Sequence, residues 1–127
     1  MGSVRRYSKD HTWIAVDGMR ARVGISDFAQ GELGDIAYVE LPAAGTAVQR
    51  GDVACTVDSL KSSSEIYAPV TGTIVEVNAA LSAEENYVLV NRDPLGDGWL
   101  FEIEMSNPAE LDLLLDEETY AAFIRGA

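Results

Sequence analysis

The stretch VDSLKSSSEIYAP, residues Val57–Pro69, holds one of only two lysines in a chain of 127 residues. Alternating residues in VACTVD (53–58) precede it, and the β-favouring run EIYAP (65–69) completes it. Two such runs around a short polar segment predict a β-hairpin, with Lys61 at or beside its tip. An exposed amine on a stiff support suits covalent attachment of a carried group. Position alone also fits an ordinary solvated turn lysine, which is the commoner case.

The remainder of the chain predicts a mainly β fold. Strand-like runs are TWIAV (12–16), MRARVG (19–24), IAYVEL (36–41), VACTVD (53–58), EIYAP (65–69), TIVEV (73–77) and WLFEIEM (99–105). Asp17-Gly18 between the first two runs is a two-residue hairpin signal. Ser26 as N-cap and Gly34 as the residue after the last turn predict a short helix between them. The period of two in VACTVD places Val53, Cys55 and Val57 on one face and Ala54, Thr56 and Asp58 on the other.

Two segments break the β pattern. Residues 78–98 are polar, and we expect mostly loop with at most one helical turn. The tail has Asn107 as a candidate N-cap, Pro108 at the first helical position and leucines at helical spacing. Asp116 can start a second helical stretch that Gly126 ends. We therefore predict a single domain spanning residues 1–127 with a helical C-terminal appendage at about residues 107–126.

Composition narrows the class of protein. The chain has 21 acidic and 9 basic residues and a net charge of −12, which disfavours nucleic acid and anionic lipid as partners. That charge suits partners with basic faces, or serves solubility alone. The chain has a single cysteine, Cys55, so no internal disulfide can form. It has a single histidine, His11, so there are few cysteine or histidine ligands for a metal ion. No apolar run is long enough for a membrane helix. We expect a cytoplasmic protein.

The segment GDVACTVDSLKSSSEIYAPVTGTIVEVN (51–78) closely resembles the lipoyl-attachment segment of the glycine cleavage system H protein family. As in that family, an acid, Asp58, stands three residues before the lysine, and Gly72 follows eleven residues after it. Flanking blocks are similar along almost the whole chain: YSKDHTW (7–13), VGISDFAQGELGDIAYVELPAAGTAVQRGD (23–52), VNRDPLGDGWLFEIEMSNPAEL (90–111) and DEETYAAFI (116–124). Biotinyl domains usually have methionines on both sides of their lysine, whereas this chain has Leu60 and Ser62. This difference disfavours biotin as the attached group.

The resemblance implies a lipoyl/biotinyl-type β-sandwich, a flattened barrel or barrel-sandwich hybrid, with its hairpin region at about residues 36–78. It implies a carrier rather than an enzyme, with lipoic acid in amide linkage to Lys61. The lipoyl group would accept an aminomethyl group from a pyridoxal-phosphate glycine decarboxylase and present it to a tetrahydrofolate-dependent aminomethyltransferase. A dihydrolipoamide dehydrogenase would reoxidise it, and a lipoate-attaching enzyme would install it.

The resemblance also implies the site residues and the setting. The residues implied to surround the lipoyl group are Lys61, Asp58, Glu65, Ser62, Thr12 and His11. We expect a monomer in a bacterial cytoplasm rather than a mature mitochondrial protein.

The chain departs from the family at two places. The family usually reads His-Glu-Trp where this chain has Thr12 between His11 and Trp13, and that glutamate lies beside the loaded arm. The absence of this glutamate leaves three alternatives. Another acid takes its place, the aminomethyl group on the arm is less protected, or the arm carries a group other than aminomethyl. The loop at residues 79–91 is longer than usual and lacks a proline. Thr12 keeps open the alternative of an H-like carrier or relay in lipoate transfer or sulfur metabolism. A second alternative, from a different class, is an interaction module with an unmodified lysine.

Overall fold

A computed structural model describes residues 4–125 of the chain. The strands are β1 (Val4–Tyr7), β2 (Thr12–Asp17), β3 (Arg20–Ile25), β4 (Ile36–Glu40), β5 (Ala47–Val48), β6 (Val53–Ser59), β7 (Ser63–Tyr67), β8 (Gly72–Val77) and β9 (Phe101–Met105). The α-helices are α1 (Asp27–Leu33), α2 (Val88–Arg92) and α3 (Glu117–Arg125), and the 3-10 helices are η1 (Ala79–Ser82), η2 (Glu84–Asn86) and η3 (Pro108–Leu113). None of these helices is long and apolar enough to cross a bilayer.

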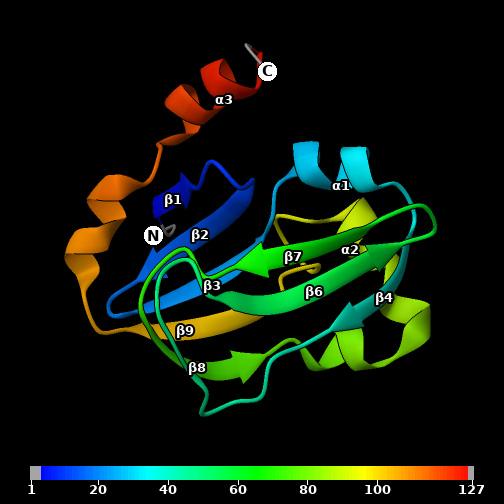
Figure 1. The fold of residues 1–127 in the computed structure, drawn as a ribbon, viewed down its shortest axis with the longest axis horizontal. Coiled ribbons are helices and arrows are strands. Elements are labelled where there is room, and N and C mark those ends of the chain that lie inside the picture. Colours follow the sequence, from blue (N-terminus) through cyan, green and yellow to red (C-terminus); the bar gives the residue numbers. More distant parts are fainter. Residues whose placement is uncertain (1–3, 126–127) are drawn as a thin grey trace.

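The strands form two antiparallel sheets. One sheet has the order β1-β2-β3-β9-β8-β5, and the other has the order β4-β6-β7. Figure 1 shows β6 and β7 of the smaller sheet lying across β3 and β9 of the larger one. A single apolar core joins their inner faces, and it includes Val57 and Ile66 from the small sheet and Val23, Ile74 and Phe101 from the large one. This arrangement confirms the predicted β-sandwich.

Local signals in the sequence give the first half of the fold. Asp17 pairs with Arg20 across the β2–β3 turn, where Gly18 has a φ of 65°. Ser26 caps α1 by accepting a hydrogen bond from the Ala29 N–H. Gly34 ends the helix with a φ of 82° and donates its N–H to the Gln30 carbonyl. Both the hairpin and the short helix predicted from the sequence are confirmed.

The hairpin β6–β7 follows the predicted alternation except at its start. Cys55 and Val57 are buried in the core, and Thr56 and Asp58 lie on the opposite face. Val53 was predicted on the core side, but it is 48% exposed. The cause is an irregularity in the register with β7 between Val53 and Cys55, which interrupts the period of two.

Two other predictions were wrong in detail. The segment 78–98 contains η1, η2 and α2 instead of mostly loop. Asn107 makes no side-chain cap bond, and the stretch after it is the 3-10 helix η3 rather than an α-helix. Asp116 does begin α3, because its carboxylate accepts the Thr119 N–H at 2.7 Å. Residue Gly126, which was expected to end that helix, lies outside the described residues.

Helix α3 is attached to the first strand and not to the smaller sheet. Leu115, just before α3, exchanges two backbone hydrogen bonds of 2.8 Å with Tyr7 of β1. The ring of Tyr120 stacks on that of Tyr7 at a centroid distance of 4.3 Å, and together with Trp13 they form a second small cluster.

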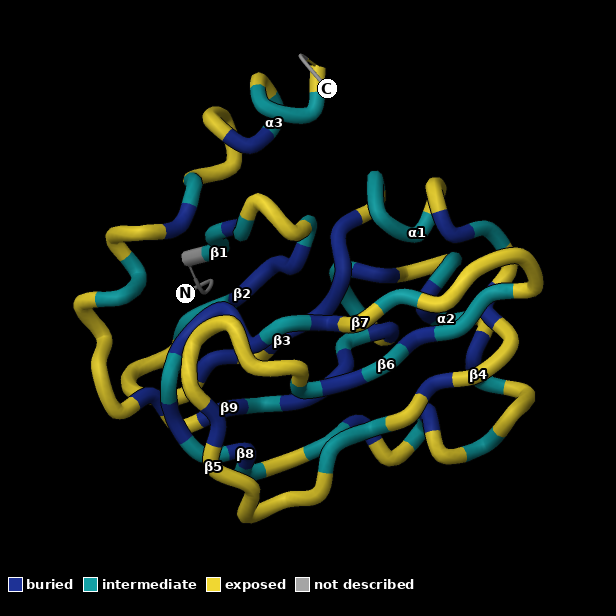
Figure 2. Tube along the Cα trace, in the orientation of Figure 1, coloured by how far each residue is buried: buried dark blue, intermediate teal, exposed yellow. Residues whose placement is uncertain are grey.

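Figure 2 shows the exposed tip of the β6–β7 hairpin beside the connection from α1 to β4.

Candidate functional site

The turn that carries Lys61 is built by one serine. The Ser59 side-chain oxygen accepts hydrogen bonds from the backbone N–H groups of Lys61 (3.2 Å) and Ser62 (3.0 Å). The Ser59 N–H donates to the Ser62 carbonyl at 2.7 Å, which closes the turn. Lys61 and Ser62 are both exposed. Short polar side chains at turns form such local bonds, so the backbone beneath Lys61 has a defined shape.

The same turn is also tied to the rest of the molecule. The Leu60 N–H donates to the Asp35 carbonyl at 3.1 Å, which joins the hairpin tip to the loop between α1 and β4. The aliphatic stem of Lys61 lies over Gly34, where a methyl group on the glycine would come within 3.4 Å of Lys61 Cε. Lys61 therefore lies on a turn that is fixed by hydrogen bonds of Ser59 within the turn and by a hydrogen bond to Asp35 of the adjacent loop.

Asn91 of α2 fixes that neighbouring loop, and sequence reasoning did not single it out. Its amide nitrogen donates to the Gly34 carbonyl at 2.8 Å, and its amide oxygen accepts the Ile36 N–H at 3.0 Å. A third bond, at 3.0 Å, joins it to the Gln30 side chain. Its place in the segment 78–98, which was expected to be mostly loop, gave no signal for this role.

The two acids predicted around Lys61 lie on the outer face of the hairpin. Asp58 accepts a hydrogen bond from the Ser63 hydroxyl at 2.7 Å. Glu65 accepts one from the Tyr67 hydroxyl at 3.2 Å, which raises the pKa of that phenol. Within residues 4–125 neither acid forms an ion pair with Lys61. Each carboxylate accepts a hydrogen bond from a hydroxyl group of strand β7.

A cleft of about 280 Å³ is lined in part by Ser64, three residues after Lys61, and by Leu33. Its walls come from the β1–β2 turn, from β7 and from α1, and its lining residues are Asp10, His11, Ile25, Phe28, Ala29, Glu32, Leu33, Ser64 and Ile66. Leu33 directly precedes Gly34, over which the lysine stem lies. The cleft therefore combines an apolar floor with two carboxylates within reach of a group attached to Lys61.

A shallower and more open pocket of about 730 Å³ adjoins this cleft. It is lined by Lys9, Asp10, His11, Thr56, Ser63, Ser64, Glu65 and Tyr67. The two hollows share Asp10, His11 and Ser64, so His11 stands where they meet. Thr12 is 1% exposed and is absent from the residues that line either hollow.

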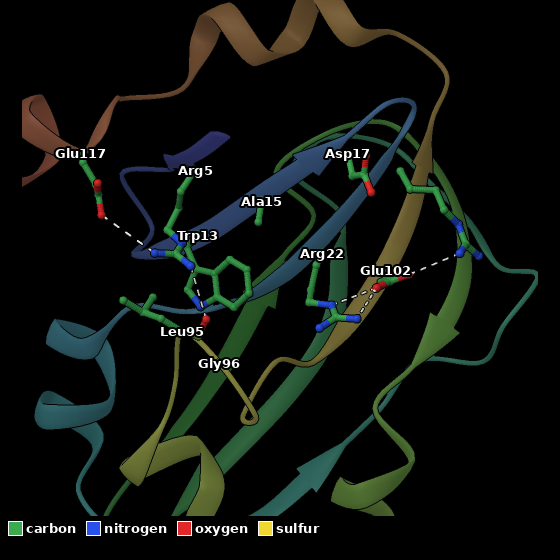
Figure 3. Close-up of a pocket in the computed structure, with 10 residues that line it drawn as sticks. Arg5, Trp13, Ala15, Asp17, Arg22, Leu95, Gly96, Glu102 and Glu117 are labelled. Carbon is green, nitrogen blue, oxygen red and sulfur yellow. Dashed lines mark hydrogen bonds and ion pairs between the residues drawn. The ribbon is translucent and has the colours of Figure 1, made fainter. Parts of the chain in front are cut away.

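A third hollow, of about 610 Å³, is lined by the exposed face of the larger sheet and not by the hairpin (Figure 3). Its arginines already have partners: Glu102 lies 2.8 Å from Arg22 and 3.6 Å from Arg20, and Glu117 lies 4.0 Å from Arg5. Arg5 also covers the Trp13 ring at 5.3 Å. No residue of the β6–β7 hairpin is among the residues that line this hollow, so it is not the place for a group carried on Lys61.

A β-sandwich that presents an exposed lysine at the tip of a fixed β-hairpin defines the class of lipoyl- and biotinyl-type carrier domains. Within this class, the family model described as "Glycine cleavage H-protein" matches residues 5–127. The chain belongs to the glycine cleavage H-protein family.

Individual relatives match 94% of the chain or more. A glycine cleavage system H protein of Methylocella silvestris is 51% identical over 120 residues, 94% of each chain. One from Thermotoga maritima is 44% identical over 94% of this chain and 95% of its own. The crystal structure of a glycine cleavage system H protein from Mycobacterium marinum superposes with a TM-score of 0.84 at 34% identity and covers all of both chains.

Proposed function

We propose that this chain is the lipoyl-carrying shuttle of the glycine cleavage system, with lipoate in amide linkage to Nζ of Lys61. The observation that supports this most is the exposed amine of Lys61 on a turn fixed by Ser59 and by the Leu60–Asp35 bond. The chain acts as a carrier and not as an enzyme. It exchanges the carried group with a glycine decarboxylase, an aminomethyltransferase and a dihydrolipoamide dehydrogenase, and receives lipoate from an attaching enzyme. We infer a cytoplasmic monomer.

The cleft beside Lys61 fits this cofactor. Phe28, Leu33 and Ile66 give it an apolar floor that suits an alkyl chain and a sulfur ring, since apolar surface gains by leaving water. When bound, lipoate supplies a disulfide that opens to take up a carbon group and is restored by oxidation. Asp10 and Glu32 at the same cleft are acceptors for an ammonium on that group.

In this proposal, Asp10 and Glu32 replace the glutamate that the family usually has at the position of Thr12. This residue is buried and carries no charge, so it adds no anion to the cleft. Hydrogen bonds to a charged group contribute about 1.5–3 kcal/mol, and less where water has access. Asp10 and Glu32 supply such bonds from the β1–β2 turn and from α1. The alternative of an H-like carrier in another pathway rests on the missing acid at Thr12.

The first experiment tests attachment. The unmodified protein is incubated with lipoate, ATP and a lipoate ligase, and the intact mass is measured. Lys61→Arg keeps the positive charge but lacks an acylatable amine, so we expect no gain in mass. Lys9→Arg is the matched control and should gain the lipoyl mass like the wild type. A lipoyl group on the Lys61→Arg protein would refute the assignment.

The second experiment tests the cleft. The lipoylated protein is loaded with glycine and the decarboxylase, and ammonia release is followed without the folate enzyme. Asp10→Asn and Glu32→Gln should each speed the release, whereas Glu104→Gln on the exposed face of β9 should not. Equal rates in all variants would remove the two acids from this role. A lipoylated wild type that cannot be loaded, where another H protein can, would favour the alternative pathway.

A further inference from the structure

Two linked hydrogen bonds, one buried and one partly buried, connect the C-terminal helix to the junction of the two hollows. The Tyr120 hydroxyl oxygen lies 2.7 Å from the Ser26 hydroxyl and 2.7 Å from Nδ1 of His11. Ser26 is 2% exposed and Tyr120 is 5% exposed. His11 is the single histidine of the sequence, and it lines both the cleft and the open pocket beside the hairpin.

The directions of these bonds follow from the number of hydrogens available. The Ser26 oxygen accepts the Ala29 N–H at 3.1 Å as the cap of α1, so its own hydrogen still needs an acceptor. Among the described residues, the acceptor within reach is the Tyr120 oxygen. Tyr120 must then donate its hydrogen to Nδ1 of His11. The reverse order would leave the buried Ser26 hydrogen without a partner, which is costly.

We propose that Tyr120 is a positioning residue that selects the His11 tautomer with its hydrogen on Nε2, so that the cleft gains a hydrogen-bond donor from His11. Because Nδ1 is taken by Tyr120, Nε2–H is the group left to bind an acceptor. On a lipoyl arm, such acceptors are the amide oxygen and the sulfur atoms. This last step rests on the proposed function, whereas the tautomer of His11 does not.

Two further contacts and the backbone conformation of His11 support this arrangement. Tyr120 stacks on Tyr7 with the ring planes 5° apart, and the Tyr7 hydroxyl donates to Glu117 of the same helix as Tyr120 at 3.3 Å. His11 has a φ of 68°, a left-handed conformation that few residues other than glycine adopt, which sets the direction of its side chain. The phenol of Tyr120 is a donor at neutral pH, since its ordinary pKa is about 10, and burial raises that pKa further.

Nitrogen NMR provides the test, because one histidine gives one pair of ring nitrogen signals. The unmodified protein is measured above the ordinary histidine pKa of about 6.5. We expect Nδ1 to show the chemical shift of an unprotonated nitrogen and Nε2 that of a protonated one, as a single tautomer. A hydrogen on Nδ1 in the wild type would overturn the proposal.

Two matched variants separate positioning from packing. Tyr120→Phe keeps the ring on Tyr7 but removes the donor to His11, so both tautomers should become populated. We expect a change of about two- to tenfold in their ratio, as loss of one hydrogen bond allows. Tyr7→Phe removes the other hydroxyl of the stacked pair and should leave the His11 signals unchanged. Identical tautomer ratios in all three proteins would show that Tyr120 has only a structural role.

Lipoylation then tests the contact with the arm. Attachment of lipoate to Lys61, verified by mass, should shift the Nε2 signal in the wild type and in Tyr7→Phe, with a smaller shift in Tyr120→Phe. No shift in a fully lipoylated wild type would refute the contact between His11 and the arm. If Lys61 is not lipoylated at all, the proposed function fails while the tautomer result stands.

Discussion

Replacing Gly34 by alanine should destabilise the protein through its backbone. Gly34 has a φ of 82° and a ψ of −156°, a region that is essentially restricted to glycine. A non-glycine residue held there costs about 1–3 kcal/mol. The added methyl group would lie 3.4 Å from Cε of Lys61, which is an ordinary contact with the flexible end of a side chain. Strain in the backbone, rather than a clash, therefore accounts for the expected loss.

Gly31 in α1 provides the matched control. It is exposed, and a methyl group there would have no neighbour within 4 Å. Alanine is the better helix former by about 0.5–1 kcal/mol, so Gly31→Ala should stabilise the protein. The same chemical change should thus have opposite signs at two positions three residues apart.

Urea unfolding measures both effects. With a slope of about 2 kcal/mol per molar urea, a loss of 2 kcal/mol lowers the midpoint by about 1 M. Gly34→Asn is a sharper variant, because asparagine tolerates the left-handed helical region but not a ψ near −156°. It should lose about as much stability as Gly34→Ala. Equal stability of the Gly34→Ala and Gly31→Ala proteins would refute the reasoning.

Three further predictions concern the supports of the site and the core. Asn91→Ala removes three hydrogen bonds around the loop beneath Lys61 and should cost about 1–3 kcal/mol of unfolding free energy, measured with urea; a loss below 0.5 kcal/mol would contradict it. Burial raises the pKa of the Cys55 thiol to about 12, so the unfolded thiol, with a pKa of about 8.5, loses its proton first as the pH rises. Stability should therefore fall between these pH values by up to about 1.4 kcal/mol per pH unit, and Cys55→Ala should remove that component from the pH dependence of unfolding. Hydrogen bonds from Thr119 lower the pKa of Asp116, so the stabilisation from this cap is present above the ordinary carboxyl pKa and is lost as the pH falls through the lowered pKa. Asp116→Ala should therefore speed amide hydrogen exchange at Thr119 at neutral pH. Unchanged exchange would count against the cap.

The parts of the fold that the sequence predicted are those governed by neighbouring residues. Ser26 and Gly34 mark the ends of α1 by bonds within the helix, and Asp17-Gly18 marks a turn between adjacent strands. The register irregularity at Val53 could not be predicted, because it depends on how β6 meets β7. The helix α2 was missed because its five residues are too few to show a clear helical period.

The candidate site divides in the same way. Lys61 and its exposed turn could be predicted from strands on either side, with the family resemblance indicating its use. The cleft could not, since it joins the β1–β2 turn, α1 and β7, which are far apart in the sequence. The contacts of Tyr120 with His11 and Ser26 span 109 and 94 residues, beyond any local pattern. The resemblance indicated His11 and Thr12, of which His11 lines the cleft and Thr12 does not, and it did not indicate Asp10, which also lines the cleft.

The bond between Leu60 and Asp35 has a consequence for how an attached arm moves. Because the turn is held by Ser59 inside and by Asp35 outside, its backbone reorients with the whole molecule. Fast motion on the nanosecond scale then belongs to the lysine side chain and whatever it carries. The direction in which the arm leaves the surface is constant in the frame of the body. A partner enzyme that binds the folded domain in one orientation therefore directs the arm toward its own active-site entrance. Rotational diffusion of the carrier sets how often that orientation is sampled.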